Sequence, residues 1–306
     1  MTPSLGAFVA RRLAVAVLFV VVVSSGALAL ARLAPGDASA QLALSGARAD
    51  VVQDFRQRFG IDRSLPALLG DWIAGLATLD LGQSSFYNQP VAGLVADRAA
   101  GTARLAGLAL LVATVIGLPL GVLTGARPRG PLAAVVTPIS TALIACPPLI
   151  AVLALLWLAV ATGWLSVAPG DLALPAIAIA LPLAAALERL QSQAIADALA
   201  SVDLTAAAAR GIPPRRRLWI HAARQSLRPV LGVYGVMVGS VLSGSLAVEV
   251  MTSWPGLGQL TYEALVGRDR FLVAGCALAG AVFIALGNLA ADIARAAIDP
   301  RVRDLS

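Results

Sequence analysis

The chain has 306 residues, of which 58% are hydrophobic and 13% are charged, and its formal net charge is +6. This composition lies far outside the range of soluble globular proteins and indicates a polytopic membrane protein. All 23 basic residues are Arg, so the Lys that a nucleotide-binding loop or Schiff-base chemistry needs is missing. We therefore expect no catalytic centre and no cofactor bound by this chain. Because the Arg residues cluster at the ends of apolar segments, membrane orientation explains the positive charge better than a nucleic-acid partner does.

Six apolar segments are long enough to supply the roughly 20 residues that a helix needs to cross a bilayer. The first follows Arg11 and Arg12, and its length favours a retained anchor over a cleaved signal peptide. If Arg11 and Arg12 lie in the cytosol, every second loop along the chain is Arg-rich and also lies in the cytosol. Both termini are then cytosolic, and Arg301 and Arg303 mark the C-terminal one. The sequence thus predicts an all-α membrane protein with six spans, at 12–33, 102–125, 132–160, 172–194, 228–250 and 271–294.

Residues 34–101 form one long segment between the first two spans, and the charge alternation places it outside the cytosol. It carries seven Asp and five Arg, and the apolar spacing within 51–59 and 68–76 predicts two short helices over the outer face. A solvated lid without a contact role is the alternative. We expect two domains, namely an N-terminal anchor with its outer segment, 1–101, and a transmembrane core of five helices, 102–306.

The third span contains Pro138 and the pair Pro147-Pro148. Proline has no backbone N–H, so a regular helical ladder cannot continue through it. We expect a kink near the middle of the bilayer. Such a break often lines a translocation path, although it can equally be a packing adjustment.

An Arg-rich island at 196–228 separates the fourth and fifth spans and carries six Arg against two Asp, which predicts a cytosolic position. Ala206 to Ala209 favour a helix, Gly211 favours its end, and Pro213-Pro214 favour the start of a second short helix. Two short helices joined at a glycine would form a compact docking surface. The charge alone is explained equally well by attraction to anionic membrane lipids.

Residues that could carry chemistry are few and scattered. His221 is the one histidine, and Cys146 and Cys276 lie on separate spans, so we expect no metal site. Glu188 lies near the inner end of the fourth span, where acids usually snorkel or pair. Glu249 lies at the outer end of the fifth span, before a Trp-Pro-Gly turn, and is a candidate for a gate or for a structural hydrogen bond to that turn.

Two classes of membrane protein can be assessed from these residues. A gradient-driven carrier without an ATPase would be favoured by buried membrane carboxylates and inverted repeats, and neither is expected from the sequence. A membrane-embedded protease or lipid transferase would need His, Asp or metal ligands gathered at one cavity, and the sequence offers no such cluster.

Short motifs follow one another in a specific order along nearly the whole chain. They are Arg11-Arg12-Leu13, Arg32-Leu33-Ala34-Pro35-Gly36-Asp37, Phe59-Gly60-Ile61-Asp62, Leu79-Asp80-Leu81-Gly82-Gln83-Ser84, Ser253-Trp254-Pro255-Gly256-Leu257-Gly258, Arg268-Asp269 and Asp299-Pro300-Arg301-Val302-Arg303. Together they resemble the membrane permease subunits of binding-protein-dependent ABC importers, in the dipeptide, oligopeptide and nickel branch.

The resemblance implies that the Arg-rich island is the cytosolic coupling loop, which seats in a cleft of an ATPase subunit. Small Ala side chains would permit close approach, and a glycine would permit the turn. Thr205 stands where the family motif has an acid, and Asp203 stands where an aromatic residue is usual. The implied coupling residues are Asp203, Thr205, Ala206, Ala207, Gly211, Ile212, Arg215 and His221.

The resemblance also implies an outer gate or binding-protein docking site at the turn after the fifth span. Thr252 replaces a common Phe there, and Arg270-Phe271 replaces an aromatic-proline pair. The implied residues are Glu249, Trp254, Pro255, Gly256 and Gly258.

By the same resemblance, the chain is one permease of a plasma (inner) membrane importer. Its implied partners are a homologous second permease, two ABC ATPase subunits that use ATP and Mg, an extracytoplasmic solute-binding protein, and membrane lipids. Short peptides are the commonest substrates of this branch. Nickel chelates, glutathione or another small solute are the alternatives.

Overall fold

The computed structural model describes residues 5–298, except for the side chains of residues 5–9, 41, 228, 240, 242, 243 and 294–298. Within this range the regular structure is helical, and the one extended pairing is an isolated bridge between Gln83 and Pro90. The all-α class is therefore confirmed for the described residues. The tail motif from Asp299 to Arg303, with Arg301 and Arg303, lies outside them.

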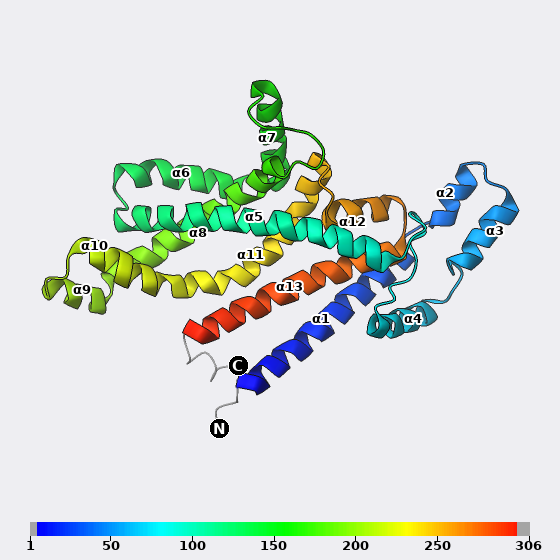
Figure 1. Ribbon diagram of the computed structural model, residues 1–306, viewed down its shortest axis with the longest axis horizontal. Coiled ribbons are helices and arrows are strands. Elements are labelled where there is room, and N and C mark those ends of the chain that lie inside the picture. Colours follow the sequence, from blue (N-terminus) through cyan, green and yellow to red (C-terminus); the bar gives the residue numbers. More distant parts are fainter. Residues whose placement is uncertain (1–4, 299–306) are drawn as a thin grey trace. The chain divides into compact units, whose positions relative to one another are not determined.

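The helices follow the apolar segments of the sequence, and most extend beyond them by a few residues (Figure 1). In chain order they are α1 Leu5–Leu33, α2 Ala38–Leu44, α3 Ala49–Arg58, α4 Leu65–Thr78, α5 Val91–Ala126, α6 Pro131–Ala145, α7 Pro148–Thr162, α8 Ala173–Ala200, α9 Val202–Ala209, α10 Pro214–Arg216, the π-helix η1 Arg217–Ala222, α11 Ala223–Thr252, α12 Leu257–Val266 and α13 Arg270–Ile298.

Four of these helices, α1, α5, α8 and α13, are long and apolar enough to cross a membrane. Two further candidates are bent pairs. The helices α6 and α7 meet at 112°, and two stretches of α11, Pro229–Gly239 and Gly244–Thr252, meet at 49°. If each bent pair is one span, the described residues hold six, which is the number of apolar segments in the sequence.

The break expected at the proline pair is confirmed. α6 ends at Ala145, Cys146 is extended, and α7 starts at Pro148, from where it leaves at a steep angle (Figure 1). Proline fits the first turn of a helix, where its missing N–H has no intrahelical partner in any case. Pro138, by contrast, lies inside α6 without ending it.

The chain divides into two compact units, each with its own core. The inner unit, as we name it, contains Arg104–Trp254 and the described chain ends up to Val9 and from Leu286. The outer unit contains Ala10–Ala103 and Pro255–Ala285. The division into 1–101 and 102–306 that the sequence predicted stays a prediction.

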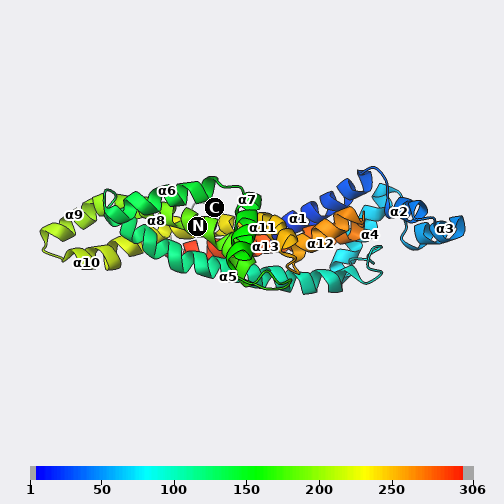
Figure 2. The ribbon, with the colours of Figure 1, turned by 90° about the horizontal axis from the view of Figure 1, so that it is seen from above.

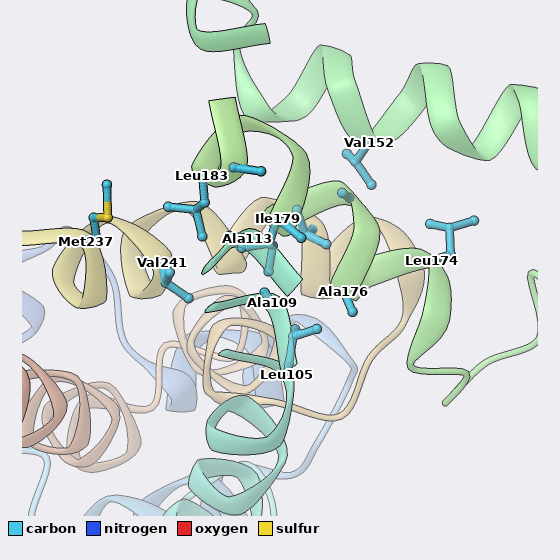
Figure 3. Packing of buried hydrophobic residues seen from close by; sticks show 14 of the residues in the cluster. Leu105, Ala109, Ala113, Val152, Leu174, Ala176, Ile179, Leu183, Met237 and Val241 are labelled. Atoms are coloured by element: carbon cyan, nitrogen blue, oxygen red, sulfur yellow. The ribbon is translucent and has the colours of Figure 1, made fainter. Parts of the chain in front are cut away.

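In the inner unit, α8 is the central helix. It packs against α6, α7 and α11, and side chains of α5 complete the core. Figure 3 shows Leu105, Ala109 and Ala113 of α5 in the same apolar cluster as Ala176 and Ile179 of α8. Many of the core side chains are Ala, which lets the helices approach closely.

In the outer unit, Trp72 of α4 is buried beneath α1 and donates its indole N–H to Ser24 Oγ at 3.3 Å. Its core also takes Leu260 from α12 and Leu272 from α13. The helices α2 and α3 pack together as a short pair (Figure 2). The two short helices predicted at 51–59 and 68–76 are confirmed as α3 and α4.

Candidate functional site

The helix α9 buries one face and exposes the other. Leu204 and Ala207 are 5% exposed and point into the inner unit. Figure 1 shows α9 beyond the end of α8, next to α10. The apolar cluster beneath it consists of Val122, Ile195, Ala198, Leu204 and Ala222. This packing fixes the orientation of α9 through apolar contacts.

The predicted coupling residues Asp203, Thr205 and Ala206 are all on the exposed face of α9. Ser201 caps the helix, since its Oγ accepts the Leu204 N–H at 3.5 Å, and Thr205 Oγ1 donates to the Ser201 carbonyl at 2.9 Å. These hydroxyls are used within the helix. The exposed face therefore presents mainly methyl groups and one carboxylate to whatever lies against it.

Gly211 ends α9 as the sequence predicts. Its N–H donates to the Ala208 carbonyl at 2.9 Å, and the Ile212 N–H donates to Ala207 at 3.2 Å. The φ angle of Gly211 is +80°, the left-handed region that favours glycine. No atom lies within 4 Å of where a Cβ would stand, so the requirement for glycine is conformational rather than steric.

A second helix starts at Pro214, as the prolines predict, but the prediction that it is short and separate is wrong. From Pro214 to Thr252 the chain is helical without interruption, passing through α10 and η1 into α11. The physical reason is that no Gly or Pro occurs between Arg215 and Arg228 to end the helix. Arg215 and His221 are exposed on this continuous helix.

Large apolar side chains are exposed around α9. Val202 is 83% exposed, Trp219 48% and Ile220 54%. Apolar groups gathered with exposed Arg are suited to contact with another protein or with lipid headgroups.

The backbones of α5 and α8 lie close together where glycines of α5 face α8. Gly117 and Gly121 of α5 face α8, and a Cβ on either would lie 2.6 Å from the carbonyl oxygen of Ala184 or Glu188. Gly125, one turn further, faces the Ser192 backbone in the same way. Glycines at this spacing let two membrane helices pack closely.

Glu188 is buried and hydrogen-bonded, so of the two expected behaviours, snorkelling and pairing, the structure contradicts the first. It is 1% exposed, and Thr124 Oγ1 donates to its Oε1 at 2.6 Å. Its Oε2 has no hydrogen-bond partner among the described residues. The expectation of no buried membrane carboxylate is therefore wrong, because Glu188 faces the glycine row of α5 and not the lipid.

A second buried hydrogen bond joins α8 to α11. Gln191 Nε2 donates to Ser226 Oγ at 2.8 Å, and both side chains are at most 2% exposed. Sequence reasoning missed both polar contacts. The one available signal was a group of polar residues, among them Glu188, Gln191 and Ser192, in a helix whose first half is entirely apolar.

The residues of the predicted outer gate are divided between the two units. Glu249 and Trp254 belong to the inner unit, and Pro255, Gly256 and Gly258 belong to the outer unit. In the inner unit, Glu249 is fully buried in the last turns of α11, and its carbonyl accepts the Trp254 N–H at 2.9 Å. Ser253, with a φ angle of +52°, ends the helix, and Trp254 is buried in the inner core.

In the outer unit, Gly256 precedes α12 in an extended conformation and Gly258 is buried in its first turn. Thr102 Oγ1 accepts the Leu257 N–H at 2.7 Å. A Cβ at Gly101 would collide with the Pro255 carbonyl, so this glycine permits close approach. The gate role of the group stays a prediction.

A polar cluster around Asp269 in the outer unit was not foreseen. Asp269 is 1% exposed; its Oδ2 accepts Ser84 Oγ at 2.6 Å and the Phe86 N–H at 3.1 Å, and its Oδ1 accepts the Leu272 N–H at 3.1 Å. Nearby, Tyr87 donates to Glu263 at 2.5 Å. Burial raises the pKa of Tyr87 to about 12, and this hydrogen bond acts in the same direction.

A family model described as the inner membrane component of binding-protein-dependent transport systems matches residues 117–304. The chain belongs to this family. It is a permease subunit of an ABC importer, located in the inner membrane, and the family works with an ABC ATPase and a solute-binding protein. The resemblance drawn from the sequence motifs is thereby confirmed.

Several relatives are similar over most of their length. A protein described as a peptide transport system permease in Brucella abortus (strain 2308) is 29% identical, covering 97% of this chain and 99% of its own. The oligopeptide transport system permease AppB of Bacillus subtilis (strain 168) is 29% identical, with 82% and 84% covered. The glutathione transport system permease GsiC of Escherichia coli O6:H1 is 28% identical, with 88% and 90% covered.

Proposed function

We propose that the chain forms half of the translocation pathway of an importer for short peptides. Full-length similarity to relatives named for peptide transport is the observation that carries this proposal. In the proposed topology the six spans place both termini in the cytosol and residues 34–101 outside. A homologous second permease would complete the pathway.

We further propose that the exposed face of α9 is the coupling surface. Two ATPase subunits would bind ATP and Mg and contact this face, and a solute-binding protein would deliver cargo at the opposite side of the membrane. The support is physical. The face carries small side chains, its other side is anchored in the apolar cluster of the inner unit, and exposed Val202 and Trp219 flank it.

In this scheme, closure of the ATPase subunits moves α9, and α8 transmits the movement into the core. The close α5–α8 packing and the Glu188–Thr124 hydrogen bond favour movement of the two helices as one rigid body. The buried Glu249 and the turn after it would act as the outer gate.

Glutathione is a second candidate substrate, because one relative at 28% identity is named for glutathione transport. Both candidates contain peptide bonds, whereas a nickel chelate does not. Competition of unlabelled peptides, glutathione and nickel chelates against labelled peptide uptake separates the three. Inhibition by glutathione alone would replace the peptide assignment.

The first test is to purify the tagged chain gently from its own membrane and to identify the proteins recovered with it. A second permease and an ABC ATPase in near-equal amounts support the proposal. Recovery of a stable chain by itself would favour a gradient-driven carrier, and the exposed face of α9 would then be a lipid contact.

The coupling role of α9 is tested by Gly211→Ile. A β-branched side chain at a φ angle of +80° is strained by about 1–2 kcal/mol. The matched control is Gly163→Ile, because Gly163 also has a positive φ angle, +65°, and no neighbour within 4 Å of a Cβ. Both variants should lose similar stability, and only Gly211→Ile should lose uptake coupled to ATP hydrolysis. Equal uptake by the two variants would refute the role.

A further inference from the structure

Three arginines surround a small cavity in the outer unit. Its volume is about 40 Å³. Arg32 comes from the end of α1, Arg268 comes from the turn before α13, and Arg270 is the first residue of α13. These are parts of separate sequence motifs that the importer function left without a role. The wall also includes Gly36, Asp37, Phe59, Ile61, Asp269 and Phe271.

Two of the arginines are fixed by backbone carbonyls. Arg270 donates to the Phe59 carbonyl at 2.8 Å. Arg268, whose own φ angle is +54°, donates to the Pro35 carbonyl. A Cβ at Gly36 would collide with the Arg268 guanidinium, so the glycine makes room for it. These hydrogen bonds go to neutral carbonyl oxygens, while the charges of Asp37, Asp62 and Asp269 partly offset that of Arg270.

The two acids that line the cavity are engaged elsewhere. Asp37 accepts hydrogen bonds from Ser39 Oγ at 2.5 Å and from the Ala40 N–H at 3.0 Å, and its other oxygen lies 3.4 Å from Arg56. Asp269 is occupied by its three donors from Ser84, Phe86 and Leu272. Three guanidinium groups therefore face these two carboxylates, whose hydrogen bonds already go to other residues. A third acid, Asp62, attracts Arg32 and Arg270, but its hydrogen bonds come from Arg56.

Arg32 has an unmet hydrogen-bonding requirement. Its Nε is buried and has no hydrogen-bond partner among the described residues. Its charge also repels that of Arg270. A buried donor without a partner is costly, and like charges in a partly dehydrated cavity add to that cost.

We propose that this cavity is a binding site for one carboxylate group, with Arg32 as its principal donor and Arg268 and Arg270 supplying positive charge. Guanidinium groups bind carboxylates in a planar, two-pronged arrangement. A water molecule needs about 10–15 Å³ by the same measure of volume, so the cavity accommodates a carboxylate head and not a whole peptide. The rest of the ligand must extend out of it.

Two ligands could present such a group, and here the inference rests on the proposed function. One is the terminal carboxylate that every unmodified short peptide carries. The other is an acidic side chain on the solute-binding protein. Both supply the same chemistry to Arg32, and the experiment separates them.

The absence of Lys from the chain provides the test. Arg32→Lys introduces one side-chain amine at the cavity, and a carbodiimide then joins it to a bound carboxylate as an amide, with loss of water. Arg270→Lys places an amine on another wall and serves as an independent second variant. The complete transporter in nanodiscs is treated with trialanine, with C-terminally amidated trialanine, or with the solute-binding protein, and the amide is located by mass spectrometry.

If an amide forms with trialanine but not with the amidated peptide, the proposal is supported and the ligand is the carboxylate at the end of the peptide. An amide to an acidic residue of the binding protein supports it and names the protein. Arg58→Lys is the control, since Arg58 is exposed on α3, outside the cavity, and bonds Asn88. The same labelling in this control, no amide in either cavity variant, or amides only to Asp37 or Asp269 would overturn the proposal. Copurification of the native chain with its ATPase tests the proposed function separately.

Discussion

The exposed face of α9, which we propose as the coupling surface, and the arginine cavity are held in place by opposite means. Around α9 the contacts are apolar, and the helices behind it meet through Ala and Gly. Around the cavity, guanidinium groups and a carboxylate fix the turns through hydrogen bonds to backbone atoms. Apolar packing tolerates sliding and rocking better than directional hydrogen bonds do. This difference fits the proposal that the inner unit moves as packed helices, and it teaches that the walls of the cavity in the outer unit are fixed by directional polar contacts.

The strongest test of this contrast is Asp269→Ala in the outer unit. The change leaves the buried donors of Ser84, Phe86 and Leu272 without their acceptor, and we expect a loss of roughly 3 kcal/mol in stability. Asp71→Ala is the control, because Asp71 is exposed and pairs with Arg63, so its loss should stay below about 1 kcal/mol. Thermal unfolding in detergent measures both. Similar losses would mean that the polar cluster does not hold the outer unit.

The inner unit is tested by Gly121→Leu. The new side chain meets the Glu188 carbonyl and should force α5 and α8 apart, at a cost of about 2 kcal/mol. Gly107→Leu is the matched control on the same helix, since no atom lies within 4 Å of a Cβ there. Thermal unfolding should separate the two variants, and an equal effect would show that close α5–α8 packing is unimportant.

The buried hydrogen bond between Thr124 and Glu188 in the inner unit is tested by Thr124→Val. The change keeps the volume and removes the donor to Glu188, so we expect a loss of about 1.5 kcal/mol. Thr141→Val, on the exposed side of α6, should be nearly neutral because its hydroxyl donates to the Thr137 carbonyl of its own helix. If unfolding measurements find the two variants alike, the buried hydrogen bond does not stabilise the helix pair.

The smallest expected effect concerns pH and the outer unit. A hydrogen bond from Arg56 lowers the pKa of Asp62 from its ordinary value of 3.8. A carboxyl whose pKa is lowered on folding stabilises the fold above its ordinary pKa, and that contribution disappears as the pH falls through the lowered value. Asp62→Asn should therefore reduce the unfolding temperature slightly at pH 6 and have no effect below the lowered pKa. A difference that persists unchanged in acid would contradict the assignment.

The sequence predicted features that depend on neighbours in the chain. The helix end at Gly211 and the break at Pro147-Pro148 follow from backbone chemistry, and both are confirmed. The helices α3 and α4 follow from apolar spacing. The family was predicted from the order of motifs along the chain, and the match to the family model over residues 117–304 confirms it.

Contacts between distant segments could not be predicted in this way. Ser84 and Asp269 are 185 positions apart, and Thr124 and Glu188 are 64 apart, so no local pattern reports either hydrogen bond. The two prolines correctly predict where the second helix starts, but they do not predict where it ends. They begin a helix that then runs on into α11.

The buried Glu188 has a consequence for the order in which the chain assembles. An acid that faces lipid costs about 2.5–3.5 kcal/mol at the centre of a bilayer, and a smaller amount toward the end of a span, where Glu188 is expected. Its Thr124 partner belongs to α5, which precedes α8 in the chain and is made first. A permease in which the two helices have not yet met is therefore penalised by the exposed carboxylate as well as by the missing packing. Glu188 thus makes a half-assembled membrane subunit energetically distinct from a finished one.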